Sequence, residues 1–207
     1  MTTPSIIKVT PNVECFSVTW TITNKCNYDC MYCPDFLHAG DQVYSLSEMK
    51  SYWMDIFHKT QHKNLKYKIS FTGGEVTINK DFLPFVEWLR ENYKDHIHMI
   101  LMTTNGSASV KYYTKLFNSI NNISFSFHGE HANEKIFFDK MVKLRRTISP
   151  KKFMHINIMN EYWIEDRIPL YIQLLEKNYI SHSVNLIDYK IGTRVVPILK
   201  GKTNLEI

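Results

Sequence analysis

The chain has 207 residues, of which 44% are hydrophobic, and this composition fits one domain with a full apolar core. Its net charge of +5 is modest and its lysines are scattered, so a nucleic-acid partner is not favoured. It lacks an apolar run of membrane-spanning length and a secretory signal, so we expect a cytoplasmic protein with no membrane partner.

Six β-branched and aromatic segments alternate with amphipathic segments along the chain. Strands are expected at residues 16–23, 67–72, 97–103, 123–127, 153–159 and 183–187. Helices are expected at residues 45–58, 81–93, 109–118, 133–147 and 165–178. Ser45 and Glu48 have the spacing of a capping box, and Pro84 and Pro169 fall near helix starts, where proline is tolerated. The alternation predicts parallel βαβ units that form a barrel or an open doubly wound sheet.

The first expected strand leads into a loop that holds three of the four cysteines, Cys26, Cys30 and Cys33, spaced C-x3-C-x2-C. Reduced, clustered thiols indicate a metal site. Structural zinc takes four ligands, so a zinc-binding module would use His38 as the fourth. An iron–sulfur cubane held by three cysteines would instead leave one iron open to another ligand. The remaining thiol, Cys15, precedes the strand and is interpreted as packed and inert.

Glycines and polar residues follow the later strands. They form the segments Gly73-Gly74-Glu75, Thr104-Asn105-Gly106 and His128-Gly129-Glu130-His131. Because the carboxyl ends of parallel strands form the active face, we expect these segments on one rim with the cysteine loop. His128, Glu130 and His131 are candidates for acid–base chemistry or a second metal, with a solvated loop as the alternative. Further side chains are expected near this mouth: Asp35, His38, Glu161, Tyr162, Trp163, Asp188 and Tyr189. His96 and His98 are expected at the far rim in structural roles.

Taken together, these motifs resemble the signature of the radical S-adenosylmethionine (radical SAM) superfamily. The resemblance rests on the cysteine loop with Tyr32 before its last cysteine, on the segments 73–75 and 104–106, and on Ser124 to His128. It implies an α/β fold, a partial (βα)6 TIM-like barrel with parallel strands. It also implies a single radical SAM core domain over residues 1–207, with the core at about 16–188 and a short extension at 189–207. No cysteine follows Cys33, so no auxiliary-cluster (SPASM or twitch) domain is expected.

The resemblance implies an enzyme with a [4Fe-4S] cluster and SAM as cofactors. Such an enzyme cleaves SAM reductively and uses the 5′-deoxyadenosyl radical to abstract hydrogen from a substrate, here a small molecule, a nucleotide or a peptide. An electron donor such as flavodoxin or ferredoxin is implied as a partner. Cys26, Cys30 and Cys33 would hold the cluster, with His128 and Glu130 as further catalytic candidates. The residues implied around SAM are Tyr32, Gly73, Gly74, Glu75, Thr104, Asn105, Ser126, Asn157 and Met159.

Two narrower resemblances stay open. In size the chain resembles 7-carboxy-7-deazaguanine synthase, although its cysteine loop does not match that enzyme closely. Cys26-Asn27-Tyr28 is similar to the loop of viperin-like nucleotide enzymes, but three residues do not carry an assignment. The substrate is therefore not predicted from the sequence.

Overall fold

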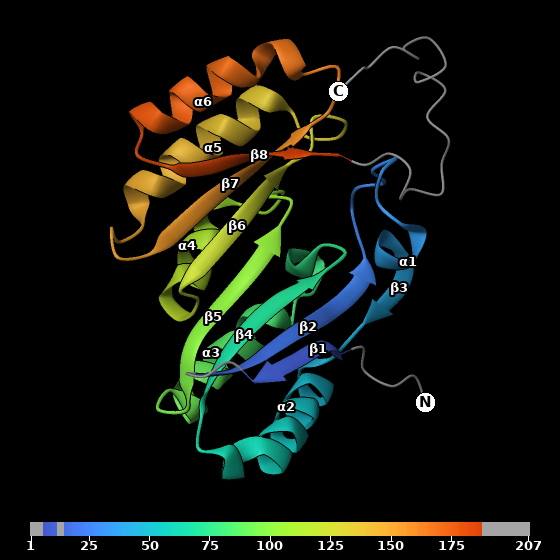
Figure 1. Ribbon diagram of the computed structural model, residues 1–207, viewed down its shortest axis with the longest axis vertical. Coiled ribbons are helices and arrows are strands. Elements are labelled where there is room, and N and C mark those ends of the chain that lie inside the picture. Colours follow the sequence, from blue (N-terminus) through green and yellow to red (C-terminus); the bar gives the residue numbers. More distant parts are fainter. Residues whose placement is uncertain (1–5, 12–14, 188–207) are drawn as a thin grey trace.

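The computed structural model describes residues 6–11 and 15–187, which form one twisted sheet with helices packed along it (Figure 1). The strands are β1 (Ile6–Pro11), β2 (Cys15–Lys25), β3 (Ala39–Val43), β4 (Lys66–Gly73), β5 (Ile97–Thr104), β6 (Asn122–Phe127), β7 (Phe153–Asn160) and β8 (Ser181–Leu186). The helices are α1 (Asp35–His38), α2 (Leu46–Thr60), α3 (Phe82–Tyr93), α4 (Val110–Ser119), α5 (Glu134–Thr147) and α6 (Ile168–Lys177). Short 3-10 helices are η1 (Gln61–Lys63), η2 (Val76–Ile78) and η3 (Glu165–Arg167).

Six strands run parallel in the order β2-β4-β5-β6-β7-β8, which confirms the predicted α/β architecture. A helix lies between each pair of consecutive parallel strands, as parallel connections require. The arrowheads of these strands all lie toward one side of the sheet (Figure 1). The loops that follow the strands therefore gather on a single rim.

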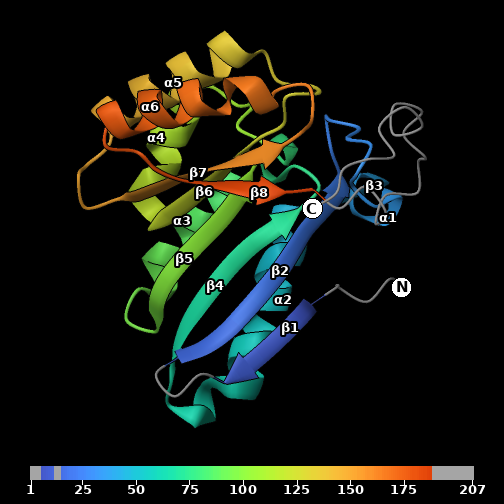
Figure 2. The ribbon, with the colours of Figure 1, turned by 45° about the horizontal axis from the view of Figure 1, so that its top comes forward.

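The prediction of six strands was incomplete, because β1 and β3 also join the sheet. Both pair antiparallel with β2, β1 along its first part and β3 at its end. Strand β3 pairs Lys25 with Ala39 and Thr23 with Val43. Together with α1 it returns the chain to β2 after the cysteine loop, and the two elements lie beside the tip of β2 in both ribbon views (Figures 1 and 2). The two ends of the cysteine loop are thereby fixed to the same strand.

The core lies between the sheet and helices α2 to α6. Alternate residues of strands β2 and β4 to β7 are buried there, such as Trp20 of β2 and Phe71 of β4. Trp20 packs edge-on against Phe85 of α3 at 5.4 Å between ring centroids. The residues between them, including Thr19 and Ser70, face the other side of the sheet. The helices thus cover one face and leave a hydroxyl-rich face opposite.

Helices α2 to α5 begin within one residue of the positions that the sequence predicts, whereas α6 begins at Ile168, after the 3-10 helix η3. Ser45 and Glu48 form the expected capping box at the start of α2. Ser109 and Asn133 cap α4 and α5 by accepting hydrogen bonds from the third residue of each helix. Pro169 lies in the first turn of α6. Within the described residues, no helix has both the length and the apolar character needed to cross a membrane.

Candidate active site

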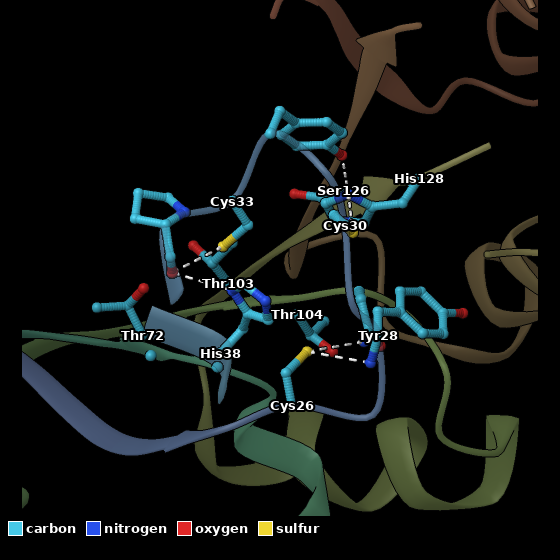
Figure 3. A pocket seen from close by; sticks show the side chains of 15 residues that line it. Cys26, Tyr28, Cys30, Cys33, His38, Thr72, Thr103, Thr104, Ser126 and His128 are labelled. Atoms are coloured by element: carbon cyan, nitrogen blue, oxygen red, sulfur yellow. Dashed lines mark hydrogen bonds between the residues drawn. The ribbon is translucent and has the colours of Figure 1, made fainter. Parts of the chain in front are cut away.

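A cavity of about 270 Å³ lies at the carboxyl ends of β2, β4, β5 and β6 (Figure 3). Three strands, β4, β5 and β6, contribute lining residues, together with the loop after β2. The lining residues are Cys26, Tyr28, Cys30, Tyr32, Cys33, Pro34, His38, Thr72, Gly73, Gly74, Thr103, Thr104, Asn105, Ser126 and His128. The parallel sheet therefore brings most of the predicted site residues to one place.

The three cysteines of the loop all face this cavity (Figure 3). The Cys26 sulfur accepts hydrogen bonds from the Tyr28 N–H at 3.4 Å and the Asn105 side-chain amide at 3.9 Å. The Cys30 sulfur lies 3.6 Å from Nδ1 of His128. Burial raises the pKa of Cys26 and Cys30 and raises the pKa of Cys33 to about 11. In the metal-free chain these groups are thiols at neutral pH, so metal binding displaces their protons.

The spacing of the three sulfur atoms fits a multi-iron cluster better than one zinc ion. Ligands of a single ion must converge, yet Cys26, Cys30 and Cys33 do not form a group of ligand atoms within 4.8 Å of one another. His38 is already engaged, because Nδ1 lies 2.9 Å from the Pro34 carbonyl oxygen and Nε2 lies 2.9 Å from Oδ1 of Asp29. The geometry therefore does not support the zinc module with His38. Three thiols around a roomy cavity suit a cluster with one iron open to another ligand.

Gly73 and Gly74 allow the end of β4 to lie directly against the start of the cysteine loop. The Gly74 N–H donates to the Thr23 carbonyl at 2.8 Å, and the next N–H, of Glu75, donates to the Lys25 carbonyl at 2.9 Å. A Cβ atom at Gly74 would lie 2.2 Å from the Lys25 carbonyl oxygen, and Gly73 has a φ of +138°. Only glycine fits this approach without displacing backbone. The glycine pair therefore sets the distance between the cysteine loop and the second rim segment.

The Glu75 side chain is fully buried and lies behind the cavity wall. Its Oε1 accepts from the Thr77 N–H at 2.9 Å, the Thr77 hydroxyl at 2.6 Å and the Thr104 hydroxyl at 2.7 Å. Its Oε2 accepts from the Asn105 N–H at 2.6 Å. The carboxylate thus joins the ends of β4 and β5 and fixes Asn105, which lines the cavity. A direct contact between Glu75 and a bound amino group stays a prediction.

Some of the other residues predicted to contact the cofactor line the cavity, and others do not. Thr104, Asn105 and Ser126 lie on the cavity wall, and Asn105 also donates to the Asn27 side chain at 2.8 Å. Asn157 and Met159 of β7 do not line it. The structure therefore does not bring these two residues to the thiols.

His128 and Tyr32 form a stacked pair beside Cys30, with 5.9 Å between ring centroids, and the Tyr32 hydroxyl contacts Nδ1 of His128. The same hydroxyl donates to Oε1 of Glu161 at 3.4 Å. Burial lowers the pKa of His128 to about 4, with nearby His131 adding to the shift. Burial also raises the pKa of Tyr32, and it raises the pKa of Glu161 to about 7. His128 is therefore a neutral imidazole at neutral pH in the metal-free chain.

The remaining candidates lie around this group or away from it. Glu130 accepts from the Met31 N–H at 3.0 Å, while the rings of Tyr162 and Trp163 pack edge-on at 4.7 Å. Asp35 is exposed in α1 beside the cavity, with Oδ1 3.9 Å from Nε2 of His38 on the cavity wall. The candidates away from the cavity are Cys15, buried at the start of β2, and His96 and His98, exposed around the start of β5. Asp188 and Tyr189 lie outside the described residues.

Sequence reasoning missed several cavity residues, notably Tyr28, Thr72 and Thr103. A signal for the two threonines exists, because they alternate with the buried Phe71 and Met102 and therefore point to the opposite face. They also line a second hollow of about 390 Å³ on the hydroxyl-rich face, which adjoins the cavity. No comparable periodicity marks Tyr28, whose position depends on the loop.

Comparisons with known proteins agree with this geometry. The family model described as Radical SAM superfamily matches residues 20–190. A GTP 3',8-cyclase of Pasteurella multocida is 34% identical over 92 residues, covering 44% of this chain and 26% of the relative. An S-adenosylmethionine-dependent nucleotide dehydratase of Selenomonas ruminantium is 31% identical over 93 residues, covering 44% of this chain and 30% of the relative. The chain thus spans less than a third of the length of either relative.

A solved structure extends the likeness to most of the described fold. SuiB of Streptococcus suis, bound to the precursor peptide SuiA, superposes with a TM-score of 0.59 at 18% identity, over 88% of this chain and 43% of that chain. At this identity the match concerns the fold alone. It supports the TIM-like arrangement of the parallel strands.

Proposed function

The chain belongs to the radical SAM superfamily, and on this premise we propose that it is an enzyme that reductively cleaves SAM at a [4Fe-4S] cluster and abstracts hydrogen from a substrate. The observation that carries the proposal is the meeting of three thiols with the glycine pair and the loop after β5 in one cavity. When bound, the cluster and SAM supply a 5′-deoxyadenosyl radical through one-electron cleavage of a carbon–sulfur bond.

The residues of this chain would hold these groups and exclude side reactions. Cys26, Cys30 and Cys33 would bind three irons as thiolates. The hydrogen bonds from the Tyr28 N–H and the Asn105 amide to Cys26 would orient that ligand and tune the reduction potential. SAM would lie along the backbone of residues 73–74 and the loop at 104–105, with Ser126 and Tyr32 as further contacts.

The substrate would reach the cavity along the hydroxyl-rich face of the sheet. Thr72 and Thr103 line both the cavity and the adjoining hollow, so the two spaces are neighbours. Hydroxyl groups on this face, such as those of Ser70 and Ser124, offer hydrogen bonds that would fix the target carbon. Positioning decides specificity here, since a carbon radical reacts with whichever C–H bond is held near it.

Three further parts of the proposal concern partners, location and domain organisation. An electron donor such as flavodoxin or ferredoxin would reduce the cluster. The cytoplasm suits the chain, because its four cysteines are free thiols in the structure and a reducing compartment keeps them so. Residues 1–207 would act as a single radical SAM core domain.

Anaerobic reconstitution with iron, sulfide, SAM and a strong reductant tests the proposal. We expect the wild-type chain to turn brown and to form 5′-deoxyadenosine. Cys30→Ala should lose iron and product, because it removes a cluster ligand. Cys15→Ala is the matched control, since Cys15 lies buried at the other end of β2, and it should keep both. A wild-type chain that binds iron and sulfide but forms no 5′-deoxyadenosine would contradict the proposal.

The substrate class follows from a second measurement. The names of the similar proteins point to GTP, nucleotides and a precursor peptide. Nucleotides and peptides deuterated at their C–H positions can be offered to the reconstituted chain. Transfer of deuterium into 5′-deoxyadenosine would identify the class that is accepted.

A further inference from the structure

Cys30 takes part in a second group of potential metal ligands that does not include the other cysteines. A thiol of Cys30, a carboxylate oxygen of Glu130 and a ring nitrogen of His131 lie within 4.8 Å of one another. Cys30 comes from the loop after β2, whereas Glu130 and His131 come from the loop after β6. Two loops almost a hundred residues apart thus converge on one point.

Contacts with the cysteine loop hold both partner side chains in place. Oε2 of Glu130 accepts from the Met31 N–H at 3.0 Å, and Oε1 lies 3.6 Å from Nε2 of His131. The His131 ring stacks on Tyr28 with 5.2 Å between ring centroids and 22° between the planes. The side chains of Glu130 and His131 are only 17% and 27% exposed. The three ligand atoms are therefore already close together in the metal-free chain.

The chemistry of these donors suits a divalent ion of the zinc type. Zinc accepts thiolate, imidazole and carboxylate ligands, and three protein ligands leave a fourth position for water. One thiolate and one carboxylate together balance the two positive charges of the ion. Binding releases the Cys30 thiol proton to solvent and involves no change of oxidation state.

We propose that Cys30, Glu130 and His131 form a divalent metal-ion site that shares Cys30 with the cluster site. A Cys30 thiolate bound to zinc is not free to bind iron, so the two metal centres exclude each other. Zinc would hold the chain in a state that cannot take up the cluster. The ion would bind to the chain before a cluster is assembled, so the site can be tested without the proposed reaction.

Cobalt titration of the metal-free, reduced chain tests the site, because cobalt(II) replaces zinc and absorbs when a thiolate binds it. We expect one cobalt per chain in the wild type. The double variant Cys26→Ser/Cys33→Ser should bind cobalt equally well, although it cannot hold a cluster. Glu130→Gln and His131→Ala should each weaken cobalt binding at least about tenfold, since even outer-shell changes cost this much. His98→Ala, an exposed histidine at the start of β5, is the matched control and should bind as the wild type does.

Competition with zinc gives a second readout that does not require activity. Zinc added before iron and sulfide should slow iron uptake by the wild type, and His131→Ala should remove this inhibition while still taking up iron. Loss of cobalt binding in the double cysteine variant would overturn the site, because the ion would then be held by the three cysteines. Unchanged affinity in both Glu130→Gln and His131→Ala, each with an unchanged unfolding transition, would overturn it as well.

Discussion

At the scale of single residues, Glu75 illustrates how a signature residue can act through its neighbours. The carboxylate is fully buried and accepts four hydrogen bonds from Thr77, Thr104 and the Asn105 N–H. Charge-assisted hydrogen bonds of this kind are stronger than neutral ones. The structure therefore gives Glu75 a positioning role for the loop after β5, whether or not it also contacts a bound cofactor.

Glu75→Gln should destabilise the metal-free chain. The amide nitrogen of glutamine cannot accept a hydrogen bond, so at least one buried donor loses its partner, at a cost of about 1–3 kcal/mol. Urea unfolding of the metal-free protein measures this loss. Glu134→Gln is the matched control, since Glu134 pairs with Arg167 at the half-exposed start of α5 and should cost under about 1 kcal/mol. Equal midpoints for the two variants would rule out the positioning role.

At the scale of elements, the cysteine loop is held from three directions. Strand β3 and helix α1 return it to β2, the end of β4 lies against its first residues, and the loop after β6 contacts Met31 through Glu130. The first two attachments use backbone groups at the ends of strands, and the third joins the Met31 N–H to the Glu130 side chain. The loop is therefore a part of the sheet rim rather than a free connection.

Gly74→Ala should separate the end of β4 from the cysteine loop. Its Cβ would lie 2.2 Å from the Lys25 carbonyl oxygen and 3.0 Å from the Cys26 nitrogen, so backbone must move. Overpacking of this kind lowers the free energy of unfolding by about 1–3 kcal/mol. We expect the amount of iron bound after reconstitution to decrease as well. Lys63→Ala, at an exposed position in η1, is the control and should bind iron as the wild type does. Full iron binding in Gly74→Ala would contradict this role of the contact.

The sequence predicts the parallel strands and the long helices because burial and capping leave local patterns. Residues such as Trp20 and Phe71 alternate with polar ones, and Ser45 with Glu48 marks a helix start. Strand β3 leaves no such pattern, because it is short, carries half-exposed and exposed residues and depends on pairing with β2. Its partner is set by tertiary structure, which local sequence does not encode.

The sequence predicts the parts of the candidate site for which the chemistry requires particular residue types. It predicts less well the parts that depend on the direction in which a side chain points. The three cysteines were identified from their spacing, and the glycine pair was identified from its place directly after an expected strand. The burial of Glu75, the absence of Asn157 from the cavity wall and the stacking of Tyr28 on His131 depend on how strand ends and loops turn. Residue type does not determine these directions.

At the scale of the whole molecule, helices α2 to α6 lie along one face of the sheet (Figure 2). The cavity lies at the rim formed by the carboxyl ends of the strands. The rim also carries buried polar groups whose ionisation affects the stability of the whole fold. Glu161 is the clearest of these, because it is fully buried and burial raises its pKa to about 7, with the nearby Glu130 carboxylate adding to the shift. Its pKa in the unfolded chain is the ordinary value of about 4.5.

Glu161 should therefore make the metal-free chain less stable as pH rises. Between about pH 4.5 and 7 the folded chain keeps a proton that the unfolded chain has released, so unfolding becomes easier across this window and the loss is complete above it. Relative to Glu161→Gln, the wild type should lose on the order of 1–3 kcal/mol between about pH 5 and about pH 8. Urea unfolding of both proteins at the two pH values measures this difference, in which other titrating groups cancel. Glu165→Gln, at an exposed position in η3, should instead follow the wild type at both values. Parallel stability curves for the wild type and Glu161→Gln would show that the Glu161 carboxyl group titrates alike in the folded and unfolded chains.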